Sequence, residues 1–71
     1  ILTKVNLLDI GGGDGSFAQY AMNAINTIHV YEKNENCIKI MKHNNIYSTN
    51  NFKDLSDSKY NIITLKRYII L

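Results

Sequence analysis

Cysteine is nearly absent from this chain, because Cys37 is the only one among 71 residues. A single thiol cannot form an internal disulfide bond, so we expect a protein of a reducing compartment, the cytoplasm. The cysteine and the two histidines show no spacing typical of zinc ligands, and we expect no metal site. Proline is missing altogether, while asparagine, isoleucine and lysine are frequent, a bias typical of an AT-rich coding sequence.

Long apolar runs and a strong net charge are also missing. No apolar stretch is long enough to cross a bilayer, and the first residues, ILTKVNLLDI, lack the charged and apolar regions of a signal peptide. The formal net charge is only +2, and Lys66-Arg67 is the only adjacent pair of basic residues. The sequence therefore gives no clear signal for nucleic-acid or membrane binding.

Apolar segments of two kinds alternate along the chain. Short segments rich in β-branched and aromatic residues predict strands, and longer ones with helical spacing predict helices. The order strand, helix, strand, helix, strand, loop, strand predicts an α/β fold with a mostly parallel sheet. No repeat or linker interrupts it, so residues 1–71 form one unit. The predicted strands are Val5–Ile10, Thr27–Tyr31, Ile46–Thr49 and Tyr60–Leu65, and the predicted helices are Ser16–Ile25 and Glu35–His43.

Local signals place the ends and faces of the two helices. Ser16 and Gln19 have the spacing of a capping box at the start of the first helix. Asn34 is expected to cap the second helix, and Asn44-Asn45 to end it. The apolar face of the second helix is predicted from a helical stripe that comprises Cys37, Ile40, Met41 and Asn44.

A glycine-rich loop, LDIGGGDG over residues 8–15, follows the first predicted strand. Ligands of open α/β sheets bind at the carboxyl ends of the strands, so this loop is the candidate site. A phosphate-binding P-loop needs a lysine after its glycines, and none is present. The dinucleotide pattern G-x-G-x-x-G would end at position 16, where serine stands, and the carboxylates of Asp9 and Asp14 would repel a pyrophosphate. A nicotinamide-binding module is thus disfavoured, and a positively charged ligand is favoured.

These residues resemble the first motif of class I S-adenosylmethionine-dependent methyltransferases, an acid followed by G-x-G-x-G. Asp9, Gly11, Gly13 and Gly15 match it. The resemblance implies a partial, three-layer Rossmann-like fold of about four strands and two helices. It further implies that Asp9 holds the amino group of the cofactor and that the glycines allow the backbone to approach it. Glu32, at the end of the second predicted strand, would accept hydrogen bonds from both ribose hydroxyls.

The segment after the third predicted strand carries a weaker resemblance. In NNFKDLSDSKYNIITL, Asn51 stands where the family has an adenine-binding acid, and Phe52 beside it could pack on the adenine ring. Where the family often continues with an acidic residue and a Glu-His pair, this chain reads KRYIIL. The resemblance therefore covers the cofactor-binding half only, and neither a catalytic residue nor the methyl acceptor is identified.

Two other functions stay open beside the methyltransferase. An aminopropyltransferase of the spermidine synthase type has a similar glycine loop, but it carries an aspartate just after the fourth strand, where this chain has Leu65-Lys66. A non-catalytic, truncated remnant is the alternative from another class. In the usual strand order of this fold the fourth strand lies at an edge, so we also expect pairing with another chain through that edge.

Overall fold

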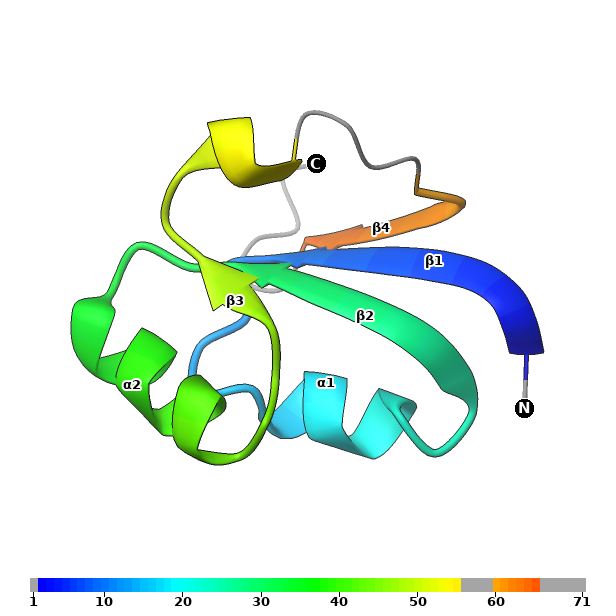
Figure 1. The fold of residues 1–71 in the computed structure, drawn as a ribbon, viewed down its shortest axis with the longest axis horizontal. Helices are drawn as coiled ribbons and strands as arrows, with labels where there is room; N and C mark the ends of the chain where they lie inside the picture. Colours follow the sequence, from blue (N-terminus) through cyan, green and yellow to red (C-terminus); the bar gives the residue numbers. More distant parts are fainter. Residues whose placement is uncertain (1, 56–59, 66–71) are drawn as a thin grey trace.

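The strands form one parallel sheet in the order β3-β2-β1-β4 (Figure 1). The structure is a computed structural model that describes residues 2–55 and 60–65. The strand order reverses between β1 and β4, which makes the carboxyl ends of these strands the expected ligand side. The α/β arrangement is consistent with a partial Rossmann-like fold, and the predicted fold class is confirmed. The strands are β1 (Leu2–Ile10), β2 (Ile25–Tyr31), β3 (Ser48–Thr49) and β4 (Ile62–Leu65).

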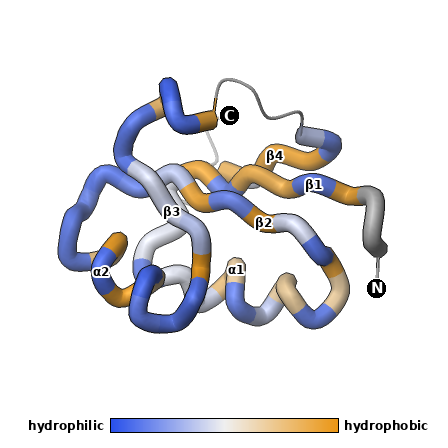
Figure 2. The backbone as a smooth tube through the Cα atoms, viewed as in Figure 1, coloured by the Kyte–Doolittle hydropathy of each residue, from blue (hydrophilic) through white to orange (hydrophobic). Residues whose placement is uncertain are grey.

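Helices α1 (Ser16–Ala21) and α2 (Glu35–His43) both lie on one face of the sheet, and the short 3-10 helix η1 (Phe52–Leu55) lies on the other (Figure 1). Side chains of β1 and β2 that point toward the α-helices form the core with apolar residues of both helices. Figure 2 shows how hydrophobic residues concentrate in β1 and β4. The buried core cluster comprises Leu7, Ala18, Ala21, Ile28, Val30, Ile38, Met41 and Ile46.

The first helix begins at Ser16, as predicted, but it differs from the prediction in its C-terminal end and in its cap. It ends at Ala21, and β2 begins at Ile25, which pairs with Leu2 of β1. Of the residues that helical spacing had assigned to the helix beyond Ala21, residues 22–24 form a turn and Ile25 joins the sheet. The predicted capping box is also wrong, because the residue before the helix is Gly15, which has no side chain to cap with. Instead, Asp14 Oδ1 accepts a hydrogen bond from the Ser16 backbone N–H at 3.0 Å.

The second helix has the predicted bounds. Asn34 Oδ1 accepts hydrogen bonds from the backbone N–H groups of Asn36 and Cys37, at 2.9 and 3.1 Å. The helix ends at His43 with Asn44 as its C-cap, and Asn45 has a positive φ of 60°. Its buried face differs from the predicted one, because Ile38 is buried beside Met41 while Ile40 is 47% exposed.

The sheet face opposite the α-helices carries aromatic side chains. His29 alternates with the buried Ile28 and Val30, so its ring lies on this face. Its centroid is 4.5 Å from that of Tyr47, and its Nδ1 is 2.7 Å from the Tyr60 hydroxyl oxygen. The predicted loop over residues 53–59 begins as η1, and its residues 56–59 lie outside the described part. Among the described residues, no helix has the length and apolar character needed to span a membrane.

Candidate functional site

The glycine loop joins the carboxyl end of β1 to α1, and its glycines fall into two kinds. Gly11 and Gly13 have positive φ angles of 74° and 61°, and a Cβ added to either would meet nothing within 4 Å. Only the backbone conformation requires glycine at these two positions, and the space beside them is open. Their backbone is only partly buried, and a ligand can therefore approach it.

The other two glycines are packed against the core. A Cβ on Gly12 would lie 2.3 Å from Val30 Cγ1, and one on Gly15 would lie 2.6 Å from Met41 Cγ. Both neighbouring side chains are completely buried. Sequence reasoning had assigned Gly15 to the approach of a ligand, whereas this residue is buried and lets α2 pack closely against the loop. Its role could not be recognised without knowing the position of Met41.

Glu32 follows β2 directly and closes the loop from the neighbouring strand. Its Oε1 accepts a hydrogen bond from the Gly13 backbone N–H, and its Oε2 accepts one from the Asn34 N–H, both at 2.8 Å. The residue is 7% exposed. Parallel pairing of β1 with β2 places the two segments side by side, since Ile10 pairs with Tyr31. The carboxylate is thereby fixed in position before any ligand binds.

Asp9 lies beneath the loop rather than on its surface. It is fully buried, and its Oδ1 accepts a hydrogen bond from Thr64 Oγ1 at 2.7 Å. A Cβ on Gly12 would stand 3.0 Å from Asp9 Oδ2, so this second oxygen faces the loop from below. Asp9 joins β1 to β4 at the point where the strand order reverses. Direct contact with a ligand would require the loop to move.

A cleft of about 470 Å³ opens at the carboxyl ends of β1 and β2. Its volume lies within the range of about 300–1,000 Å³ that is typical of small-molecule sites. It contains two of the predicted site residues, Gly11 and Glu32. Sequence reasoning did not assign the other residues to a site, because they surround the cleft only once β2 and α2 are placed. The lining residues are Ile10, Gly11, Tyr31, Glu32, Lys33, Asn34 and Cys37.

Of the two residues predicted at the adenine end, Phe52 contacts a lining residue of this cleft. The Phe52 ring stacks on Tyr31, a lining residue, with centroids 3.9 Å apart and an interplanar angle of 6°. Phe52 stays 56% exposed. Asn51 Oδ1 accepts a hydrogen bond from the Lys53 backbone N–H at 3.0 Å, so it caps the start of η1. Neither Asn51 nor Phe52 lines the cleft itself. Phe52 contacts Tyr31, and Tyr31 lines the cleft.

Asp14, the second acid of the loop, is exposed and does not line the cleft. Its carboxylate accepts hydrogen bonds from the side-chain hydroxyl of Ser16, at 2.7 Å, and from the Ser16 backbone N–H. These two bonds lower the pKa of Asp14 below its ordinary value of 3.8. Asp14 is therefore a helix-start residue, and its carboxylate needs no ligand to explain it.

Over residues 2–55 and 60–65, no three histidine, cysteine or acidic side chains gather where they could hold a metal ion. Comparisons of this chain with protein-family models, with curated proteins and with solved structures found no match.

Proposed function

We propose that the chain binds S-adenosylmethionine in the cleft at the carboxyl ends of β1 and β2, as the cofactor-binding portion of a cytoplasmic class I methyltransferase. The observation that carries the proposal is Glu32, a carboxylate held by two backbone N–H groups at the floor of that cleft. A carboxylate oxygen can accept more than one hydrogen bond, so the hydrogen bonds to the backbone are compatible with Glu32 also accepting from a ribose diol.

The loop supports the same ligand from the other side. Gly11 and Gly13 leave open space beside the backbone, which lets an extended cofactor lie against the chain without meeting a side chain. The aromatic pair of Tyr31 and Phe52 gives the cleft a flat apolar wall on the side of η1. An adenine ring would pack favourably on such a wall.

The chemistry that the cofactor supplies is an activated methyl group, transferred to a nucleophile by in-line displacement. This chain contributes binding and orientation, which raise the rate by holding the reacting atoms in line. Glu32 fixes the ribose, and the glycine loop fixes the segment that leads to the methyl group. The acceptor and the general base are not assigned to any residue of this chain.

The test is calorimetric titration of the chain with S-adenosylhomocysteine, with NAD as the competing cofactor. Glu32→Gln removes the negative charge while keeping the shape, and Glu35→Gln makes the same change at an exposed position outside the cleft. A hydrogen bond to a charged group contributes about 1.5 kcal/mol, which corresponds to about a tenfold change in affinity. We therefore expect Glu32→Gln to weaken binding by about tenfold or more. Glu35→Gln should bind normally, and NAD should give no heat.

Denaturant unfolding of the same variants separates binding from folding. Glu32→Gln weakens the contacts to the loop, so we expect it to lower the free energy of unfolding by about 1–2 kcal/mol. A folded chain that gives no heat with S-adenosylhomocysteine would contradict the proposal and leave the non-catalytic remnant. Stronger binding of NAD would favour a nicotinamide-binding module instead.

A further inference from the structure

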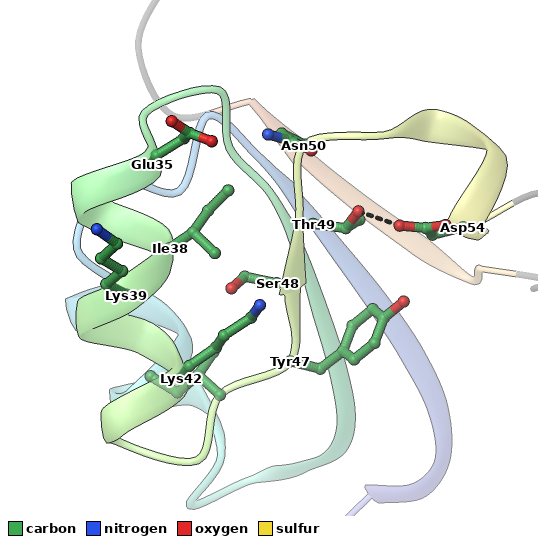
Figure 3. Close-up of a pocket in the computed structure, with 10 residues that line it drawn as sticks. Glu35, Ile38, Lys39, Lys42, Tyr47, Ser48, Thr49, Asn50 and Asp54 are labelled. Carbon is green, nitrogen blue, oxygen red and sulfur yellow. Dashed lines mark hydrogen bonds between the residues drawn. The ribbon is translucent and has the colours of Figure 1, made fainter.

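A second cleft, of about 540 Å³, lies between α2 and β3 (Figure 3). It shares no lining residue with the cleft at Glu32 and opens on another side of α2. Ile38 and Ile46, both buried, form its apolar floor, and Tyr47 stands at its rim. This open cleft therefore combines an apolar wall with polar groups, the combination typical of a small-molecule site.

The first polar group is the hydroxyl of Ser48 on β3. Ser48 is 8% exposed, and its Oγ is buried without a hydrogen-bond partner among the residues that the structure describes. Figure 3 shows this hydroxyl pointing toward α2, into the cleft. Buried polar groups in folded proteins nearly always have a partner, so the Ser48 hydroxyl in the cleft wall is a candidate donor to a ligand.

The second polar group is the ammonium of Lys42. Its side chain runs from α2 toward β3 (Figure 3), and it is exposed. Lys39 also lines the cleft, but it follows Glu35 by one helical turn, the spacing at which opposite charges attract each other. Position 38, one turn before Lys42, is an isoleucine. Lys42 is thus the cation of α2 that has no acid one turn before it.

The acidic groups of the cleft lie away from this pair. Asp54 accepts a hydrogen bond from Thr49 Oγ1, which is on the side of β3 toward η1. Glu35 stands at the first turn of α2, whereas Lys42 stands at the last. In Figure 3 Glu35 and Asp54 lie toward the ends of the cleft, away from the Ser48 hydroxyl. An anion placed at Ser48 therefore meets the lysines first.

We propose that this cleft binds a small amphipathic oxyanion. A carboxylate or phosphate group would lie between the Lys42 ammonium and the Ser48 hydroxyl, which would donate its hydrogen to an anionic oxygen. The apolar body of the ligand would pack on Ile38, which lines the cleft from α2. The Lys42 stem is long and flexible, so it can swing outward to admit the ligand to Ser48.

The experiment is an NMR titration of the full 71-residue chain with benzoate, phenyl phosphate and inorganic phosphate at constant ionic strength. We expect saturable shifts of the backbone amides of Ser48, Lys39 and Lys42. Benzoate and phenyl phosphate carry the two head groups on the same ring, so their relative affinity identifies the oxyanion. Inorganic phosphate lacks the apolar body and should bind about tenfold more weakly than phenyl phosphate.

Three variants decide whether the shifts report this site. Ser48→Ala and Lys42→Gln should each weaken binding by about tenfold, and Lys53→Gln, which makes the same charge change outside the cleft, should leave it unchanged. Ser48→Ala should not lower the unfolding midpoint, because the hydroxyl has no described partner to lose. Shifts that do not saturate, or that Lys53→Gln reduces as much as Lys42→Gln, would overturn the proposal. Destabilisation by Ser48→Ala would also contradict it, since it would assign the hydroxyl a structural role.

Discussion

Replacing Gly12 by alanine tests whether the loop is shaped by the core behind it. The added Cβ would stand 2.3 Å from Val30 Cγ1, where ordinary contacts begin at 3.4 Å. Val30 is fully buried, and its branched side chain has little rotamer freedom, so it cannot turn away. Overpacking of this kind costs about 1–3 kcal/mol, and we expect the upper half of that range. The whole chain has only about 4–10 kcal/mol of stability, at 0.05–0.15 kcal/mol per residue.

A double-mutant cycle gives the sharpest measurement. Val30→Ala alone leaves a cavity and should cost about 1–3 kcal/mol. In the double variant, the methyl group on residue 12 enters part of the space that Val30 vacates. The double variant should therefore be more stable than the sum of the single effects, by about 1–2 kcal/mol. The assay is urea-induced unfolding at 25 °C, which gives the free energy of unfolding for each of the four chains.

Gly13→Ala is the matched control. Its Cβ would meet no atom within 4 Å, but the residue has a φ of 61°, so the substitution should cost about 1–2 kcal/mol through backbone strain alone. Val30→Ala should not rescue it. If the Gly12 and Val30 effects are additive within about 0.5 kcal/mol, or if Gly12→Ala is neutral, the steric argument is refuted.

Two further predictions concern the sheet face opposite the α-helices and its edge. Burial lowers the pKa of His29 below 6.5, so the unfolded chain binds this proton more tightly. The stability that comes from the neutral His29 ring is then fully present above pH 6.5 and is lost as the pH falls below it. The measurement is the free energy of unfolding at pH 7.5 and at pH 5.5. The difference between the two values should shrink in His29→Gln but not in His43→Gln. Ile63 and Leu65 of β4 are 58% and 68% exposed, so we expect the chain to self-associate through this strand. Sedimentation velocity measures the association, and the double variant Ile63→Lys/Leu65→Lys should reduce it. The control Tyr20→Lys changes an equally exposed residue on α1 and should not reduce it, and a concentration-independent monomer of the unchanged chain would contradict the prediction.

Sequence signals were reliable where one residue sets the local structure. Asn34 was predicted to cap α2, and its side chain accepts the two expected backbone hydrogen bonds. The prediction of which face of α2 is buried was wrong, because Ile38 and Ile40 both fit a helical stripe that includes Met41. What selects Ile38 is contact with the sheet and the loop, where Gly15 leaves room for Met41. No pattern within α2 contains that information.

For the candidate site, the sequence predicted where the residues lie in the fold better than it predicted what each residue contacts. Asp9, the glycines and Glu32 were expected to meet at one edge of the sheet, because parallel strands end together. They do meet there, and Gly13 hydrogen-bonds to Glu32 across 19 residues of sequence. The difference between the open glycines and the packed ones was not predictable, since it depends on Val30 and Met41 from later elements. The stacking of Phe52 on Tyr31 also depends on where η1 lies.

The burial of Asp9 changes how this residue can select a ligand. The sequence argument used its charge against pyrophosphate, and it placed the carboxylate in contact with the amino group of the cofactor. The structure puts the carboxylate under Gly12, bound to Thr64, where a ligand on the loop does not touch it. The backbone of Gly12 therefore separates Asp9 from a ligand on the loop, and the carboxylate that hydrogen-bonds to the loop backbone at the cleft is that of Glu32. Asp9 holds β1 to β4 by its hydrogen bond to Thr64 beneath the loop, and in the proposed function Glu32 is the carboxylate that would contact the ligand directly.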